Sequence, residues 1–361
     1  MHNAFAVCER GLEGISVQEI KELIGCTAAA GDGVVTFSFK ELKELAVLCY
    51  RTQSLRRVAL LLKQFTFKDC EDIGNEVKRI DVKEFLPQGT VGIDCMRVGT
   101  HNFSSPEVTQ AISRALKKPI DYKNPQLQIF TYLIDNNCFV GVDFSGFDMA
   151  QRDYKVFAHP ASMKGTIAYA VVRMSGYERK KKMLITWSKG GTVEIEAALF
   201  ASGKSVNYYR KDNFAFWKLP QFVNEDRATF FQKIDKKINE DKLNVHGIHT
   251  DLRHVTAGKK NAKIAGVEKM ITFSRIANDW LDVKYKEGEV DILIGHAVSR
   301  EMEQMNEFFH QAEYIVAGNV IVVTLNETVE SQAAKKGFAL KEKRIITRGE
   351  SQLIVQVYEK K

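Results

Sequence analysis

The sequence predicts an α+β N-terminal part followed by an α/β part built on a mostly parallel sheet. Its 361 residues exceed the usual size of a single core, so several domains are expected. The first 150 residues alternate strand and helix patterns, whereas the segment after Gln151 carries short apolar runs separated by helix-length stretches. Such apolar runs are typical of parallel strands covered on both faces.

No membrane or export segment is evident in the sequence. No run of about 18 apolar residues occurs. The N-terminal stretch MHNAFAVCER carries charges where a signal peptide needs an apolar core. We therefore expect a cytoplasmic protein that does not bind membranes.

Residues 1–65 predict a small α+β unit. The patterns indicate strands and helices in alternation, at 4–9, 16–25, 33–39, 41–52 and 56–65. Residues 66–150 predict a second unit, with a helix, a strand, a helix and two strands at 71–80, 90–98, 105–118, 126–135 and 138–146. The last two strands are expected to face each other across a turn at Asn136 and Asn137.

Residues 151–361 predict the α/β domain, after a connecting segment at 145–160. Its apolar strand candidates lie at 183–188, 245–250, 290–298, 319–325 and 352–360. The stretch LITWSKGGTVEIEAALF, residues 184–200, has the layout of a strand, a glycine-bearing turn and a helix. Nucleotide cofactors are commonly held by such a turn.

The charge is unevenly distributed. Residues 1–150 carry 17 Lys and Arg against 19 Asp and Glu, and residues 151–220 carry 13 against 5. A local basic excess of this size suits a polyanion such as nucleic acid, although a solvated surface explains it equally well. The six cysteines are far apart and form no CxxC pair, so no metal site is expected.

The segment MRVGTHNFSSPEVTQAI resembles the THUMP domain, an RNA-binding module of tRNA-modifying enzymes. The resemblance implies that the module grips the acceptor end of tRNA, with a ferredoxin-like unit in front of it. Phosphate donors, a ring and two helix-capping serines are the residues it places at the RNA: Arg97, His101, Phe103, Ser104 and Ser105. Read without the resemblance, Phe103 is a core residue and the serines are only a helix cap.

The rest of the chain resembles the tRNA guanine-N2 methyltransferases, which have a Rossmann-like domain. RDYK (residues 152–155), HPASMKGTIAYAVVRMSGY (159–177), SKGGTVEIEAALF (188–200), GIHTDLRHV (247–255) and KKNAKIAGVEKMITF (259–273) occur in the order and spacing of that family. We expect Arg152, Lys155 and Lys164 to extend the track for RNA phosphates.

The cofactor turn departs from the family pattern. Where active relatives read Asp-Pro-(Met/Phe)-Cys-Gly-Ser-Gly-Thr, this chain reads Ile-Thr-Trp-Ser-Lys-Gly-Gly-Thr over residues 185–192. Gly190, Gly191 and Thr192 remain, but Lys189 replaces a glycine and puts a positive charge near the sulfonium of S-adenosylmethionine. We expect the turn to form and the cofactor contacts to be lost.

Two further cofactor positions are changed. The acidic residue that contacts the ribose is replaced by His249, with Asp251 two positions later as a substitute. The residue that reads the adenine amine falls at Ala277 or Asn278, with Asp279 slightly late.

The catalytic motif is also absent. Active relatives carry Asn-Pro-Pro-Tyr after the fourth strand, and this chain has Gly295, His296, Ala297 and Val298 there. The resemblance assigns the Asn side chain and a backbone carbonyl to the target amine and the ring to the flipped base.

Two main hypotheses follow. The first is a noncatalytic tRNA-binding protein without a cofactor, a pseudoenzyme that serves as the RNA-holding subunit beside a catalytic protein partner. The alternative is an active S-adenosylmethionine-dependent tRNA methyltransferase with divergent motifs, in which Asp251 and Asp279 contact the cofactor. A third possibility is another nucleotide whose phosphate meets Lys189, although the SKGGT stretch lacks P-loop spacing.

Overall fold

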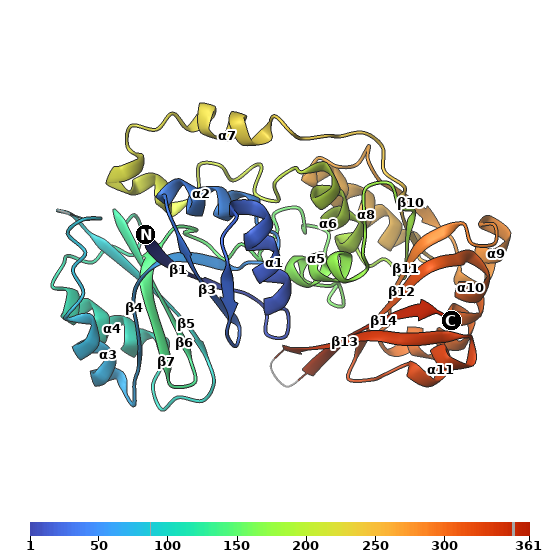
Figure 1. Ribbon diagram of the computed structural model, residues 1–361, viewed down its shortest axis with the longest axis horizontal. Coiled ribbons are helices and arrows are strands. Elements are labelled where there is room, and N and C mark those ends of the chain that lie inside the picture. The colour runs from blue at the N-terminus through green and yellow to red at the C-terminus, as the bar shows by residue number, and fades with distance from the viewer. Residues whose placement is uncertain (87, 349–350) are drawn as a thin grey trace. The chain divides into compact units, whose positions relative to one another are not determined.

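The computed structural model describes residues 1–86, 88–348 and 351–361 and contains two compact units (Figure 1). Unit 1 consists of Met1–Cys8, Ser16–Met149 and Asn207–Ile234, and unit 2 of Glu9–Ile15, Ala150–Val206 and Asp235–Lys361. The predicted succession of an α+β part and an α/β part is confirmed.

Unit 1 is built on one seven-stranded sheet. Its strands, in sheet order, are β2 (Ala28–Ala30), β3 (Val34–Phe39), β1 (His2–Val7), β4 (Arg57–Thr66), β7 (Asn137–Asp143), β6 (Leu127–Ile134) and β5 (Val91–Val98). Among these described strands, β5 and β6 pair parallel and all other neighbours pair antiparallel. Because β4 pairs with both β1 and β7, the boundary expected between residues 65 and 66 falls inside a continuous sheet.

Four helices contribute apolar side chains to the main core of unit 1. They are α1 (Glu13–Ile24), α2 (Leu42–Arg51), α3 (Cys70–Val77) and α4 (Ser105–Leu116). Helix α2 buries Leu45 and Leu48, and α4 buries Val108 and Ile112, at the three- and four-residue spacings of an amphipathic helix. A second, smaller cluster containing Phe5 and Phe130 lies on the opposite side of the sheet.

The hairpin of β6 and β7 turns one residue earlier than predicted. Ile134 pairs with Asn137, so the two turn residues are Asp135 and Asn136. Asp135 has a φ of +48°, a left-handed conformation that short polar residues tolerate.

Unit 1 also contains a segment that the sequence analysis did not predict. Residues Asn207–Ile234 include the short helices η1 (Ala215–Lys218), η2 (Pro220–Phe222) and most of α7 (Arg227–Asp235). Their aromatic rings pack against one another and against Phe144 on the segment after β7, with Phe216 at 6.2 Å and Phe222 at 6.1 Å from that ring. The aromatic contacts explain why this segment leaves the domain expected over residues 151–361.

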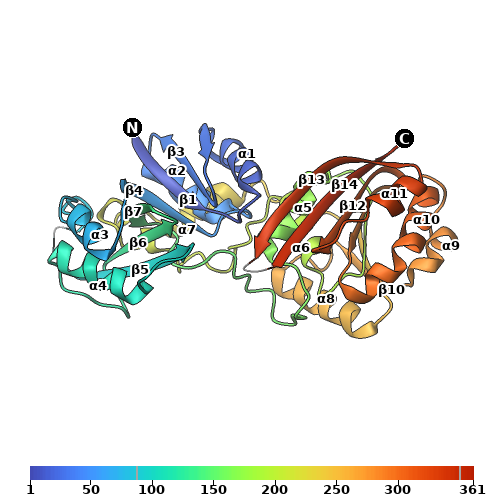
Figure 2. The ribbon, with the colours of Figure 1, turned by 90° about the horizontal axis from the view of Figure 1, so that it is seen from below.

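Unit 2 is a three-layer α/β structure (Figure 2). Its strands, in sheet order, are β10 (Thr272–Arg275), β9 (Val245–His249), β8 (Met183–Thr186), β11 (Val290–His296), β12 (Val316–Leu325), β14 (Ser351–Lys360) and β13 (Phe338–Arg348). The first five run parallel and β14 pairs antiparallel with both β12 and β13, which confirms the predicted mostly parallel sheet.

Helices cover both faces of this sheet. On one face lie α5 (Gly165–Met174), α6 (Thr192–Ser202) and α8 (Leu252–Ala265), and on the other α9 (Leu281–Lys284), α10 (Met305–Ile315) and α11 (Glu330–Lys335). Met305, Phe308 and Phe309 of α10 are buried in the core. Among the described residues, no helix combines the length and the apolar character needed to span a membrane.

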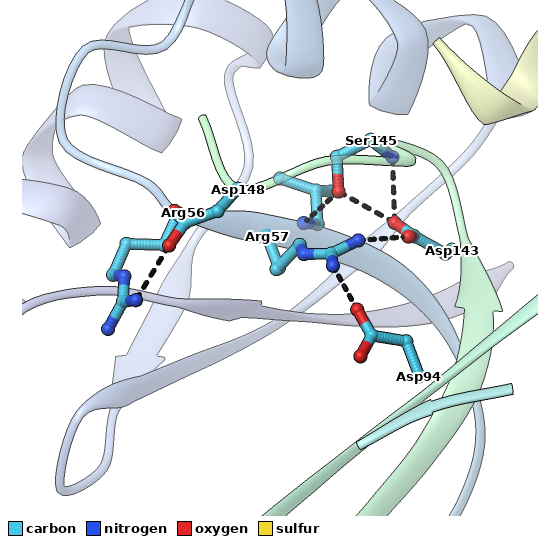
Figure 3. Close-up of polar contacts among 7 residues, drawn as sticks. Arg56, Arg57, Asp94, Asp143, Ser145 and Asp148 are labelled. Atoms are coloured by element: carbon cyan, nitrogen blue, oxygen red, sulfur yellow. Dashed lines mark hydrogen bonds and ion pairs between the residues drawn. The ribbon is translucent and has the colours of Figure 1, made fainter. Parts of the chain in front are cut away.

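An arginine buried in unit 1 ties three strands together (Figure 3). The Arg57 guanidinium of β4 donates to Asp143 of β7 at 2.5 Å and also pairs with Asp94 of β5. Ser145 donates its backbone N–H and hydroxyl to the other Asp143 oxygen at 2.9 and 2.6 Å. The Asp143 side chain is fully buried, so its charge depends on these donors.

Replacing Arg57 by methionine should destabilise unit 1 strongly. Removing one partner of a buried ion pair costs about 3–5 kcal/mol, because the other charge stays buried without compensation. Urea unfolding of Arg57→Met measures the loss, and a second change, Asp143→Asn, should restore part of it. Arg79→Ala is the control, since the Arg79 side chain is 70% exposed and its loss should leave the midpoint unchanged. Equal midpoints for Arg57→Met and Arg79→Ala would contradict this account.

Candidate active site

The candidate site of unit 2 lies beyond the carboxyl ends of β8, β9 and β11. Strand β8 continues into α6 on one face of the sheet, and its neighbour β11 is followed by α10 on the other. Parallel sheets bind ligands at the point where the connections diverge in this way. The residues that the sequence analysis selected near the ends of β8, β9 and β11 therefore lie at the same edge of the sheet.

The predicted glycine turn is present. Gly190 and Gly191 have φ values of +83° and +77°, which favour glycine. A Cβ at Gly191 would lie 2.7 Å from the Phe273 ring. The Asn261 amide of α8 donates to the Gly190 carbonyl at 2.9 Å and thereby fixes the turn.

Three buried polar atoms at this turn have no hydrogen-bond partner among the described residues. They are Ser188 Oγ, Thr192 Oγ1 and Glu194 Oε1, the last two in the first turn of α6. Burial raises the pKa of Glu194 to about 7, although Ser188 acts to lower it. Unsatisfied buried groups are rare in folded proteins and indicate a site prepared for a further polar partner.

Lys189 is held by an ion pair within the site. Its ammonium group lies 2.9 Å from Glu301 Oε1 and donates to the His296 carbonyl oxygen at 3.3 Å, and the side chain is only 4% exposed. Burial lowers the pKa of Lys189, while Glu301 acts to raise it. Burial acts to raise the pKa of Glu301, but the hydrogen bond and charge of Lys189 and two backbone hydrogen bonds together outweigh burial, so the pKa is lowered. The positive charge expected here is thus neutralised by a carboxylate.

Trp187 fills the space next to the changed catalytic motif. Its ring stacks on Phe308 of α10 with centroids 5.3 Å apart. A Cβ at Gly295 would lie 3.1 Å from the Trp187 ring and 3.0 Å from Phe308. The tryptophan and the glycine therefore fit together, and the site has no side-chain acceptor at Gly295. Trp187 adopts a φ of +53°, a strained conformation for a bulky residue.

The other two motif positions are also occupied by internal contacts. Ala297 is fully buried, and its N–H donates to Val323 at 2.9 Å. The Val298 N–H donates to Glu301 Oε2 at 3.1 Å. Ala297 and Val298 therefore offer only backbone groups for orienting a ligand.

His249 and Asp251 are both engaged at the start of α8. The Asp251 N–H donates to His249 Nδ1 at 2.8 Å, and the two rings of His249 and His254 have centroids 4.2 Å apart. Burial lowers the pKa of His249 to about 4, so the ring is neutral at pH 7. The Asp251 carboxylate caps α8 and pairs with Arg253, whose hydrogen bond lowers the pKa of Asp251. The structure therefore uses Asp251 as a helix cap.

A cavity of about 510 Å³ lies at the ends of β9 and β10. Its lining is formed by Thr250, Arg275, Ile276, Ala277, Trp280, Val283 and Lys284. Ala277, which the sequence analysis placed near the adenine amine, lines this cavity, and the buried Asn278 Nδ2 beside it has no hydrogen-bond partner.

The five THUMP residues lie together in unit 1, at the end of β5 and the start of α4. Arg97 donates to Ser105 Oγ at 3.0 Å and to the Phe103 carbonyl, and the rings of His101 and Phe103 have centroids 5.2 Å apart. Ser104 forms the capping box of α4 with Glu107. All five are half-buried, and their role toward RNA stays a prediction.

The three basic residues expected to extend the RNA track have internal partners. The Arg152 side chain is 1% exposed and is ion-paired with Glu196 of α6, so it does not face a ligand. Lys155 donates to the Met163 carbonyl at 2.6 Å, and Lys164 lies 3.4 Å from Glu9. The expectation that Arg152 contacts an RNA phosphate is therefore wrong, because the Arg152 charge neutralises the buried Glu196.

Sequence reasoning missed Glu301, Glu194 and Asn261. The acid in SREMEQ gave no spacing signal, since its partner Lys189 lies more than a hundred residues earlier. Glu194 and Asn261 were read as ordinary helix positions. The sequence signal that could have found them is a charged or amide side chain at a helix position that the pattern of apolar residues predicts to be buried.

Glu194 should make stability depend on pH in a defined direction. Its pKa is raised from 4.5 to about 7 by burial, so the folded protein loses stability as the pH rises through this interval. Glu194→Gln lacks the titration and should gain on the order of 3 kcal/mol relative to the native chain between pH 4.5 and pH 8. Urea unfolding of both proteins at pH 5 and pH 8 measures this. An equal difference in midpoint at both pH values would show that Glu194 is ionised in the folded state.

Comparison with known proteins agrees with this architecture. Residues 152–350 match the family model described as RMKL-like, methyltransferase domain, and residues 67–143 match the THUMP domain. The tRNA (guanine(6)-N2)-methyltransferase of Methanocaldococcus jannaschii is 27% identical over 362 aligned positions, covering 92% of this chain and 93% of that protein. The ribosomal RNA large subunit methyltransferase K/L of Pseudomonas fluorescens is 27% identical, but the match covers only 38% of that protein.

Two solved structures share the fold over the whole chain. SMU.472, solved in complex with SAH, has a TM-score of 0.83 at 19% identity and is matched over 98% of its length. TrmN from Thermus thermophilus has a TM-score of 0.69 at 20% identity and is matched over its full length.

These relatives correct the main functional expectation from the sequence. A noncatalytic RNA-holding protein without a cofactor was expected, yet two relatives whose matches cover 92% and 80% of this chain are named tRNA (guanine(6)-N2)-methyltransferases. The findings favour the alternative of an active methyltransferase. The family match covers more than half of the chain, so the protein belongs to the family with the RMKL-like methyltransferase domain and carries a THUMP domain before it.

Proposed function

We propose that the protein is an S-adenosylmethionine-dependent methyltransferase that modifies the exocyclic N2 of a guanine in tRNA. The observation that carries the proposal is the match to a tRNA (guanine(6)-N2)-methyltransferase over 92% of this chain and 93% of that relative. The match leaves out only about 8% of this chain, so it includes most of the residues matched as THUMP domain and as methyltransferase domain.

The described residues fit the donor molecule at the glycine turn and in the cavity. The backbone at Gly191 is free of a Cβ, and Thr192 Oγ1 beside it lacks a partner. The cavity bordered by Ile276, Ala277 and Trp280 offers apolar walls for a purine ring. Asn278 Nδ2 is an unused donor next to it.

When bound, S-adenosylmethionine supplies an electrophilic methyl group carried by a sulfonium. The protein's part is to bind the donor at the glycine turn and to orient the amine that receives the methyl group. Gly295 offers no side-chain acceptor, so the orientation depends on the His296 carbonyl oxygen at the end of β11. That oxygen now accepts a hydrogen bond from Lys189, which therefore occupies the place of an amine donor.

The Lys189–Glu301 ion pair is the part of the site that must rearrange. Two unit charges 4 Å apart repel by about 1–4 kcal/mol, depending on the dielectric constant, so an uncompensated ammonium would oppose a sulfonium. Glu301 reduces this repulsion because it brings a carboxylate to 2.9 Å from Lys189. A lysine has a long flexible stem, and it can leave the His296 carbonyl without moving the backbone.

The RNA is assigned to the THUMP cluster of Arg97, His101, Phe103, Ser104 and Ser105. The guanidinium carbon of Arg97 lies 5.8 Å from the centroid of the Phe103 ring. The cation suits an RNA phosphate, and the ring suits a stacked base. Their half-exposed surfaces leave room for such contacts, although Ser104 already caps α4.

Calorimetric titration with S-adenosylmethionine, with and without in vitro-transcribed tRNA, tests the proposal. We expect heat of binding in at least one of the two titrations. Transfer of labelled methyl to tRNA, followed by nucleoside mass spectrometry, should then show N2-methylguanosine. Absence of donor binding in both titrations, or of labelled nucleoside, would overturn the proposed function.

Changes to the ion pair should shift donor affinity in opposite directions. Lys189→Gly removes the ammonium and should tighten donor binding about tenfold, which corresponds to about 1.4 kcal/mol. Glu301→Gln leaves the ammonium uncompensated and should weaken donor binding. Calorimetry of both variants measures the two dissociation constants, and identical constants for both variants would show that the pair lies outside the donor site.

A further inference from the structure

Helix α8 presents an exposed basic face in unit 2. Lys259, Lys260 and Lys263 are all exposed, while Val255, Ala262 and other apolar residues of the helix pack into the core. Residues three and four apart lie on the same side of a helix, so the three lysines form one patch, which we call the α8 patch.

The α8 patch is not neutralised within the chain. Residues 252–265 contain no Asp or Glu, and residues 252–275 carry six Lys and Arg against one acid, Glu268. Among the described residues, none of the three lysines forms an ion pair. Like charges at these spacings destabilise a helix by about 0.2–0.5 kcal/mol per pair, so the arrangement points to an anion outside the chain.

A groove of about 410 Å³ adjoins the α8 patch. The groove is lined by the three lysines and Ala262 of α8, by the acidic Glu268, and by Ile271, Thr272 and Phe273 in and next to strand β10. Strand β10 is the edge strand of the sheet, so the groove is open along that edge. The ring of Phe157 lies 4.7 Å from the Lys260 ammonium and is 41% exposed.

We propose that the α8 patch and its groove bind the sugar-phosphate backbone of the RNA substrate. Lysine ammonium groups act as point charges that suit phosphates without regard to base sequence, and Phe157 adds a ring on which a base can stack. This assignment rests on the proposed function for the nature of the RNA. None of the basic residues selected from the sequence lies in this surface.

The position of the patch also connects it to the donor site. Phe273 forms part of the groove, and its ring contacts the glycine turn, where a Cβ at Gly191 would lie 2.7 Å away. RNA bound in the groove would therefore contact Phe273, the residue that packs against the glycine turn. An anionic membrane is the other partner that lysines attract, but the large apolar side chains that α8 exposes, Leu252 and Ile264, lie at opposite ends of the helix and form no continuous face for insertion.

The test measures binding of in vitro-transcribed tRNA to the full chain without donor, by fluorescence anisotropy at several salt concentrations. The variant is Lys259→Gln, Lys260→Gln and Lys263→Gln together. The control is Lys335→Gln, Lys341→Gln and Lys343→Gln, which removes the same charge from α11 and β13, at the opposite edge of the same sheet. Each lost phosphate contact should lower the slope of log K against log salt by about 0.7–0.9.

We expect the α8 variant to bind tRNA about tenfold to hundredfold more weakly, with the salt slope reduced by about 2, and the control to bind like the native chain. Equal binding by the α8 variant and the control overturns the α8 assignment while leaving the proposed function intact. If the native chain binds no tRNA, both proposals fail. Vesicles of phosphatidylcholine and phosphatidylserine form the last arm, and loss of vesicle binding without loss of tRNA binding would identify a membrane surface instead.

Discussion

The burial of the central parallel strands on both faces is the constraint that places the chemistry of unit 2. Strands β8 and β11 have almost no solvent-facing side, so the side chains in the middle of each strand are apolar. The polar groups of the candidate site therefore gather where these strands end and the chain turns. Trp187, Lys189, His249 and His296 all lie at such ends, which explains why residues more than a hundred positions apart form one site.

Within that site, the replacements act together. Trp187 requires the small residue at Gly295, because their contact leaves no space for a Cβ. Lys189 requires Glu301, because a buried ammonium without a partner is costly. Each change looks like the loss of a family residue when it is considered alone. The structure shows two matched pairs that keep the strand ends packed and neutral, while the glycine turn beside them retains its shape.

The sequence predicted the elements that repeat with a clear period. The glycine turn after β8, the parallel sheet and the cap of α4 at Ser104 all follow from local patterns. It did not predict β13, whose residues FALKEKRIITR mix charges with apolar residues because the strand lies at the sheet edge. Nor did it predict the aromatic segment of unit 1 around Phe216, or the partner of Lys189, because both depend on contacts distant in sequence. Arg152 was misjudged for the same reason, since Glu196 lies 44 residues away.

Two buried cations in this protein differ in what their chemistry permits. Arg57 presents a planar group that donates to two carboxylates on different strands, so its removal would break several contacts at once. Lys189 makes one ion pair and one hydrogen bond to a carbonyl, through a stem of four carbons that can rotate. An arginine suits a permanent link across a sheet, whereas a lysine suits a contact that has to open. The residue types themselves therefore argue that Arg57 maintains the fold and that Lys189 belongs to the working site.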